Sequence, residues 1–132
     1  NGLFISHRDP ILNFHKEMEN LAYVVRELLA SSLELDTKDL QRHFSRQTMG
    51  MNYYPTCPQP ELTFGLSSHS DFGTITLLMQ DVEGLQVKKG DKWINVPVIP
   101  NSFVVLLGDQ VEVHSTPNVS SMYANPPILN TL

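Results

Sequence analysis

The spacing of apolar positions in the first third of the chain is that of an amphipathic helix. Asp9 is a suitable N-cap residue, and Pro10 is the residue best tolerated at the first helical position. The pattern predicts one helix from Ile11 to Leu33. The Asp36–Thr37 pair can cap a second, short helix that runs through Leu40 to Phe44. The apolar positions of the first helix recur at helical spacing, at Phe14, Met18, Leu21, Val25 and Leu28.

After Met49 the pattern changes to short apolar runs separated by turn residues, which favours strands. KKGD, at residues 88–91, lies between two of these runs and predicts a hairpin. Several short strands preceded by helices predict an α+β fold, with a sandwich or jelly roll as its sheet. The predicted strands are MNYY at 51–54, TITLLMQ at 74–80, GLQV at 84–87, KWINV at 92–96 and SFVVLL at 102–107.

Composition and charge narrow the class of protein. The chain has 132 residues, is 41% hydrophobic and carries a formal net charge of -5, which fits one soluble globular domain. Its 9 Lys and Arg are outnumbered by 14 Asp and Glu and do not cluster, so we expect neither nucleic acid nor a membrane surface as a partner. The longest apolar run, Phe103–Leu107, is far shorter than the ~20 residues that cross a bilayer.

Cysteine usage and the first residues indicate the compartment. Cys57 is the single cysteine and has no partner for an internal disulfide, and no basic-then-apolar signal segment opens the chain. We therefore expect a reducing, cytoplasmic location. The chain begins at Asn1 without an initiating Met, which indicates a fragment of a longer protein.

His69 and Asp71 are the residues that most clearly indicate chemistry. They lie two positions apart at the head of an apolar, β-branched run, and residues two apart on a strand point to the same side. An imidazole and a carboxylate that converge in this way suit a first-row metal, as in the 2-His-1-carboxylate triad of non-haem Fe(II) oxygenases. The His-x-Asp motif alone is a weak signal, because an isolated motif of this kind is more often a surface histidine beside a turn-capping aspartate.

The wider context of this motif distinguishes the two interpretations. The stretch NYYPTCPQPELTFGLSSHSDFGTITLLMQDVEGLQVKKGDKWINVPVIPNSFVVLLGDQ, Asn52 to Gln110, closely resembles the core of plant Fe(II)- and 2-oxoglutarate-dependent dioxygenases. This family includes flavonoid, hormone and alkaloid oxygenases. The preceding helical stretch also resembles the family's long helix, so that the resemblance spans about residues 10 to 113.

The resemblance implies a set of functional residues and cofactors. It gives the roles of iron ligands to His69 and Asp71, and it places Asn52 and Tyr54 at or near 2-oxoglutarate. An asparagine that closes a turn and a tyrosine packed with its hydroxyl bonded are the alternative interpretations for the last two. The implied cofactors are Fe(II) and 2-oxoglutarate, with ascorbate in support. The implied reaction hydroxylates or desaturates a small specialised-metabolite or hormone-like substrate with O2, and it releases succinate and CO2.

The resemblance also implies an architecture, in which N-terminal helices pack on an incomplete double-stranded β-helix, or jelly roll. We expect three parts: a helical segment at 1–48, a jelly-roll core carrying the His-x-Asp motif at 49–113, and an atypical tail at 114–132. No specific protein partner can be inferred from the sequence.

The tail differs from the family pattern. Family members continue to a second iron histidine and then an Arg-x-Ser that binds 2-oxoglutarate, but no arginine follows Arg46 here. His114 is the only histidine after Asp71, and it falls earlier than the family's second ligand. The residues from 114 onward, HSTPNVSSMYANPPILNTL, carry no charge, as expected of altered splicing or reading frame. The alternative function is therefore a catalytically inactive relative that acts as a binding module.

Overall fold

The computed structural model describes residues 2–34, 46–63 and 65–112, with side chains for those between 8 and 111. The chain divides into two compact units, Asn1–Met51 and Asn52–Leu132. Each unit is described by itself.

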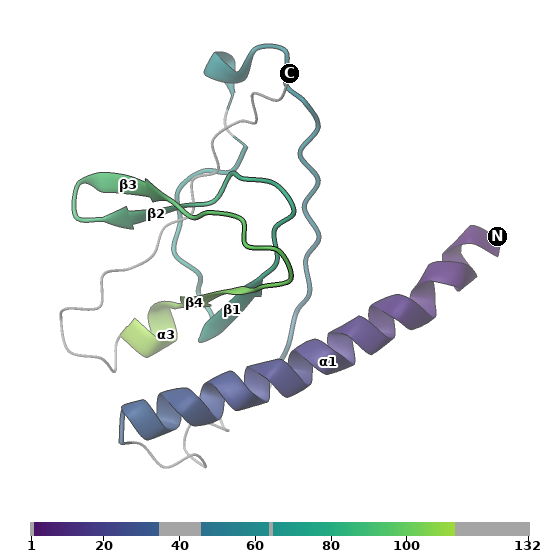
Figure 1. Ribbon diagram of the computed structural model, residues 1–132, viewed down its shortest axis with the longest axis vertical. Coiled ribbons are helices and arrows are strands. Elements are labelled where there is room, and N and C mark those ends of the chain that lie inside the picture. Colours follow the sequence, from purple (N-terminus) through teal and green to yellow (C-terminus); the bar gives the residue numbers. More distant parts are fainter. Residues whose placement is uncertain (1, 35–45, 64, 113–132) are drawn as a thin grey trace. The chain divides into compact units, whose positions relative to one another are not determined.

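The first unit is dominated by one long helix, α1, at Gly2–Ser32 (Figure 1). The expected end near Leu33 is confirmed, but the expected start at Ile11 is wrong, because Pro10 lies inside the helix. A proline inside a helix costs one backbone hydrogen bond, and the turns on both sides of Pro10 stay helical in spite of it. The predicted second helix, Leu40–Phe44, lies outside the described residues.

The end of α1 is a left-handed turn. Glu34 has a φ of 54°, and the Leu33 N–H donates to the Leu29 carbonyl at 2.9 Å. Further along this unit, the Gln47 side-chain amide donates to the His15 carbonyl at 3.5 Å.

The second unit contains two antiparallel pairs of strands (Figure 1). Strand β1, Ile75–Leu78, pairs with β4, Val104–Leu107, so that Ile75 lies opposite Leu107. Strand β2, Gln86–Lys89, pairs with β3, Lys92–Asn95, in the hairpin that the KKGD segment predicts. A 3-10 turn, η1, covers Pro60–Leu62, and a short helix, α3, covers Asp109–Glu112.

These elements agree with the expected α+β class, and the predicted strands at 74–80, 84–87, 92–96 and 102–107 are confirmed with shorter bounds. The strand expected at 51–54 is wrong, since those residues have no regular structure. A strand is stabilised by ladder hydrogen bonds to a neighbour, and within the described residues no strand pairs with this segment.

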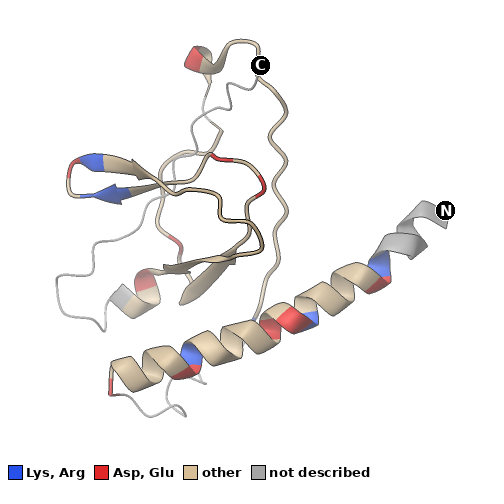
Figure 2. Cartoon of the chain, in the orientation of Figure 1, with Lys and Arg blue, Asp and Glu red and all other residues tan. Residues whose placement is uncertain are grey.

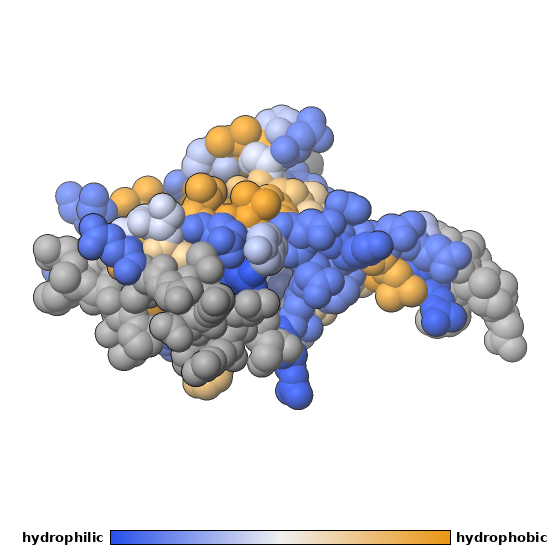
Figure 3. Space-filling view, turned by 90° about the horizontal axis from the view of Figure 1, so that it is seen from below, coloured by the Kyte–Doolittle hydropathy of each residue, from blue (hydrophilic) through white to orange (hydrophobic). Residues whose placement is uncertain are grey.

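The core of the described residues is small. Leu85, Leu106 and Val111 are the buried apolar side chains of the second unit, and Ala30 is that of the first. Figure 3 shows apolar side chains exposed among polar ones, and Met51, Leu62 and Phe72 are each more than two-thirds exposed. No helix among the described residues is long and apolar enough to span a membrane.

Charge is spread over both units. Figure 2 shows acidic and basic residues along α1 and a group of lysines at the β2–β3 hairpin. Lys88, Lys89 and Lys92 form this group, with Asp91 in the turn between the strands.

Candidate metal centre

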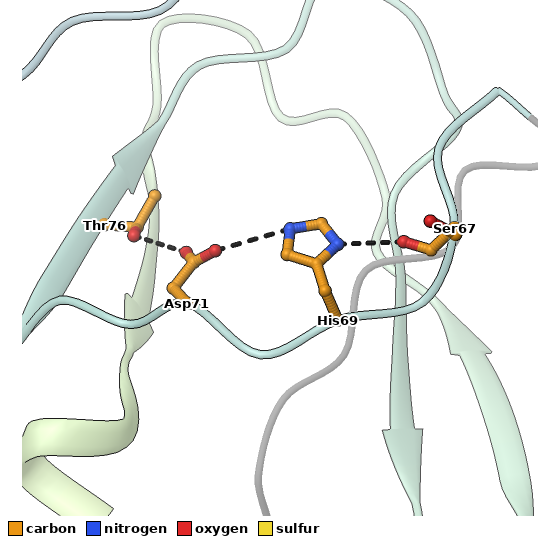
Figure 4. A network of polar contacts seen from close by, with 4 residues as sticks. All are labelled: Ser67, His69, Asp71 and Thr76. Atoms are coloured by element: carbon orange, nitrogen blue, oxygen red, sulfur yellow. Dashed lines mark hydrogen bonds and ion pairs between the residues drawn. The ribbon is translucent and has the colours of Figure 1, made fainter.

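His69 and Asp71 lie in the loop that leads into β1. Residues 67–71 have no regular structure, and the strand begins only at Ile75, so the prediction that the motif lies on a strand is wrong. The backbone here is held by contacts to a distant turn rather than by a strand ladder. The structure nevertheless brings the two side chains together: His69 Nε2 lies 3.5 Å from Asp71 Oδ1 (Figure 4).

The ring of His69 is oriented by the backbone. Its Nδ1 lies 2.8 Å from the Ser67 carbonyl oxygen. A carbonyl can only accept, so Nδ1 carries the hydrogen and donates it. In the neutral ring, Nε2 then keeps its lone pair and faces Asp71. A histidine that binds a metal usually donates its other N–H in this manner.

The carboxylate of Asp71 has a different partner on each oxygen. Oδ1 faces the imidazole of His69, and Oδ2 accepts a hydrogen bond from the hydroxyl of Thr76 on β1 (Figure 4). The Asp71 side chain is 29% exposed and that of His69 is 41% exposed. His69 is therefore exposed and Asp71 is partly buried, and the pair is open to a small ligand.

The backbone of this loop is fixed by the turn that follows β4. The Asp109 N–H donates to the Asp71 carbonyl at 2.8 Å, and the Gly108 N–H donates to the Thr74 carbonyl at 3.0 Å. The Thr74 hydroxyl adds a bond of 2.8 Å to Gln110 Oε1. Strand pairing between β1 and β4 thus continues into a set of contacts that hold the loop.

Gly108 makes this contact possible because it lacks a Cβ. A Cβ built there would lie 2.6 Å from the Asp71 carbonyl oxygen and closer still to that of Gly73. Real Cβ atoms do not approach other atoms so closely. Glycine is therefore the residue that lets the two backbones meet.

The donor set fits a divalent metal ion. Two ligand atoms each about 2.1 Å from a metal, and at right angles to one another, lie about 3.0 Å apart. The 3.5 Å between His69 Nε2 and Asp71 Oδ1 is close to this separation. Within the residues that the structure describes, no group of three or more His, Cys, Asp or Glu could complete such a site.

Asn52 and Tyr54 lie in the irregular segment that opens the second unit. Both are exposed, Tyr54 at 38%. Among the described residues, neither forms a hydrogen bond with His69 or Asp71, so their place at 2-oxoglutarate stays a prediction. His114 and the tail lie outside the described residues.

Sequence reasoning missed Thr76 and the contact role of Gly108. The signal for Thr76 was a hydroxyl within the otherwise apolar run from Ile75 to Met79. The approach of Gly108 to the Asp71 backbone depends on the fold, so no local pattern could have shown it.

Comparison with known proteins agrees with the family resemblance found in the sequence. A model of the 2OG-Fe(II) oxygenase superfamily matches residues 45–122, which is more than half of the chain. The match runs to residue 122, past the end of the stretch quoted from the sequence.

Individual relatives agree with this match. Codeine O-demethylase of Papaver somniferum is 44% identical over 111 residues, which is 80% of this chain and 31% of that protein. Protein SRG1 of Arabidopsis thaliana is 43% identical over 112 residues, again 80% of this chain and 31% of that protein. The chain thus spans about a third of the length of these curated relatives.

A solved structure has a similar fold. The crystal structure of JOX2 in complex with 2OG, Fe and JA matches with a TM-score of 0.79 and 34% sequence identity. The match covers 95% of this chain and 39% of that one.

Proposed function

Because this chain belongs to the 2OG-Fe(II) oxygenase superfamily, we propose that it forms the metal-binding core of an Fe(II)- and 2-oxoglutarate-dependent dioxygenase that oxidises a small organic molecule. The family predicted from the sequence is confirmed by these comparisons. They favour the oxygenase over the alternative of an inactive binding module.

The observation that carries the proposal is the paired orientation of His69 and Asp71. The bond from Nδ1 to the Ser67 carbonyl turns Nε2 toward Asp71 Oδ1 at 3.5 Å. These two atoms serve as adjacent metal ligands. A facial triad needs one more protein ligand, which leaves three neighbouring positions for 2-oxoglutarate and O2.

The finer architecture follows from the family. We assign the antiparallel strand pairs to an incomplete jelly roll, with residues 1–48 as the helical segment, 49–113 as the core and 114–132 as a tail. The similarity to the JOX2 structure supports this assignment. Asn52 and Tyr54 are assigned to the surroundings of 2-oxoglutarate, on the strength of the motif that they share with the family.

The proposed substrate is a small plant metabolite or hormone-like molecule. One relative is named as a codeine O-demethylase, and the JOX2 structure contains JA. Fe(II), when bound, couples the decarboxylation of 2-oxoglutarate to succinate and CO2 with the transfer of one oxygen atom of O2 to the substrate. The protein's own part is to hold the metal by Nε2 and Oδ1.

The test is succinate release from 2-oxoglutarate by the purified chain with Fe(II), ascorbate and a panel of small plant metabolites. We expect release in the wild-type protein and none in His69→Ala, because that variant lacks one of the metal ligands. His15→Ala is the matched control, since it removes an imidazole from α1 in the first unit and leaves the His-x-Asp motif unchanged, and we expect it to retain activity. A wild-type chain that releases no more succinate than His69→Ala contradicts the proposal and favours the inactive binding module.

A further inference from the structure

The two oxygens of Asp71 are unlike, and the difference comes from Thr76. We propose that Thr76 is a positioning residue for the metal centre: its hydroxyl binds Asp71 Oδ2, so that the carboxylate offers only Oδ1 to the metal beside His69 Nε2 (Figure 4). This inference rests on the proposed function, because it concerns how the same metal is held.

The first step concerns the rotation of the Asp71 carboxylate. Its main chain is fixed, because its carbonyl accepts a 2.8 Å hydrogen bond from the Asp109 N–H. The torsion that turns an aspartate carboxylate has a broad, roughly two-fold profile. A fixed backbone therefore leaves the plane of the carboxylate undetermined unless a side-chain partner holds it.

The second step is that Thr76 is itself held firmly. It lies within β1 and is paired with Leu106 of β4, and the Leu106 side chain is 6% exposed. Threonine is β-branched, so its χ1 torsion has few allowed values on a strand. An ionised carboxylate can only accept hydrogen bonds, so the hydroxyl is the donor. The bond is part-buried, where loss of a partner costs more than at the surface.

The consequence concerns the number of coordination positions that the carboxylate takes. A carboxylate that is free to rotate can bind a metal through both oxygens and so occupy two positions. With Oδ2 committed to Thr76, Asp71 takes one position only. That leaves the neighbouring position open for an exogenous ligand, as facial-triad chemistry requires.

The test uses Co(II) alone, which is stable in air and stands above Fe(II) in the affinity order of divalent metals. Calorimetric titration of the full chain gives the Kd of the wild type and of Thr76→Val, which keeps the branched shape but removes the hydroxyl. Loss of an outer-shell partner typically weakens metal binding by about 10- to 100-fold, and we expect Thr76→Val to lie in this range. Thr76→Ser restores the hydroxyl, and we expect its Kd to return to within about threefold of the wild-type value.

Thr74→Val is the matched control. Thr74 is 8% exposed, and its hydroxyl bonds Gln110 rather than the carboxylate. This variant loses a buried hydroxyl from the contacts that hold the same loop, so we expect lower stability and a smaller loss of Co(II) affinity than in Thr76→Val. If Thr76→Val does not fold, Thr76→Ala takes its place and is compared with Thr76→Ser in the same way.

The outcomes separate this inference from the proposed function. Wild-type affinity in Thr76→Val, or equal weakening in Thr76→Val and Thr76→Ser, overturns the role of the hydroxyl while leaving the metal site intact. If Co(II) binding survives in His69→Ala, His69 is not a metal ligand. The proposed metal site is then contradicted, and the inference about Thr76 fails with it. Weak binding in Thr76→Val, recovery in Thr76→Ser and a smaller loss in Thr74→Val together support the inference, whether or not succinate is released.

Discussion

At the residue scale, the geometry of the candidate metal centre depends on a residue that cannot contact the metal through a side chain. Gly108 brings the turn after β4 against the backbone of Asp71 and Gly73. The contact allows the Asp109 N–H to reach the Asp71 carbonyl at 2.8 Å. The orientation of a ligand is thus set partly by residues that lie far from it in the sequence.

Gly108→Ala should lower the free energy of unfolding. The new Cβ would meet the Asp71 carbonyl oxygen at 2.6 Å and the Gly73 carbonyl carbon at 2.9 Å, and both are backbone atoms that cannot move aside alone. Overpacking of this kind costs about 1–3 kcal/mol. Urea denaturation of the two proteins measures the difference.

Gly73→Ala is the control for this change, because it adds the same methyl group to the other side of the contact. A Cβ at Gly73 meets nothing within 4 Å. Its φ is not in the left-handed region, so the substitution should leave stability unchanged or raise it by up to about 1 kcal/mol. Equal destabilisation in the two alanine variants would show that the close approach at Gly108 is not the cause.

At the element scale, the β2–β3 hairpin shows how one turn residue sets a register. Lys89 pairs with Lys92, which leaves Gly90 and Asp91 as the turn. Gly90 has a φ of 60°, and Asp91 is not among the described residues with positive φ. This combination is typical of a type II′ turn, which places glycine first.

Gly90→Ala should therefore destabilise the hairpin. A residue with a Cβ pays about 1–2 kcal/mol to adopt a left-handed conformation, and thermal unfolding followed by circular dichroism should show a lower midpoint. Asp91→Ala, at the neighbouring turn position, should change stability by no more than about 0.5 kcal/mol. The idea fails if the two variants unfold at the same temperature.

What the sequence could predict at this scale was local. The apolar runs that became β1 and β4, and the Gly90 turn between β2 and β3, carry their signals within a few residues. The same holds for the end of α1 near Leu33. The predicted start of α1 was wrong, because a proline is compatible both with the first turn of a helix and with the interior of a long helix that loses one backbone hydrogen bond.

The candidate site was predictable only in part. The two candidate metal ligands were identifiable because His69 and Asp71 belong to one short motif, although the motif lies in a loop rather than on a strand. Their surroundings were not, because Gly108 and Gln110 reach the loop only through the pairing of β1 with β4. No local pattern in the sequence reports that contact.

At the scale of the whole molecule, the described residues bury little and leave strand edges unpaired. Each sheet has two strands in the described part of the chain, so every strand has a free edge there. No large side chain in this part is fully buried, and Tyr53 and Phe72 are 87% and 83% exposed. Unpaired edges and exposed apolar side chains both favour association between chains.

We therefore expect the isolated chain to self-associate as its concentration rises. Sedimentation velocity at two concentrations that differ about tenfold should show a larger mean sedimentation coefficient at the higher one, as mass action requires. A monomer at both concentrations that also unfolds in one sharp thermal transition would contradict this expectation.

The contacts around Asp71 also differ in the time at which they can form. The bonds of His69 to Ser67 and of Thr76 to Asp71 join residues 2 and 5 positions apart, whereas Thr74 and Gln110 are separated by 36 positions. Loops of about ten residues close within about 10–100 ns, and longer loops lose more entropy on closing. The ligand pair can therefore assemble early, as a local cluster in the unfolded chain. The backbone of this pair becomes fixed only when β4 pairs with β1. A metal ion bound before that step would therefore lower the entropy that is lost when the sheet forms.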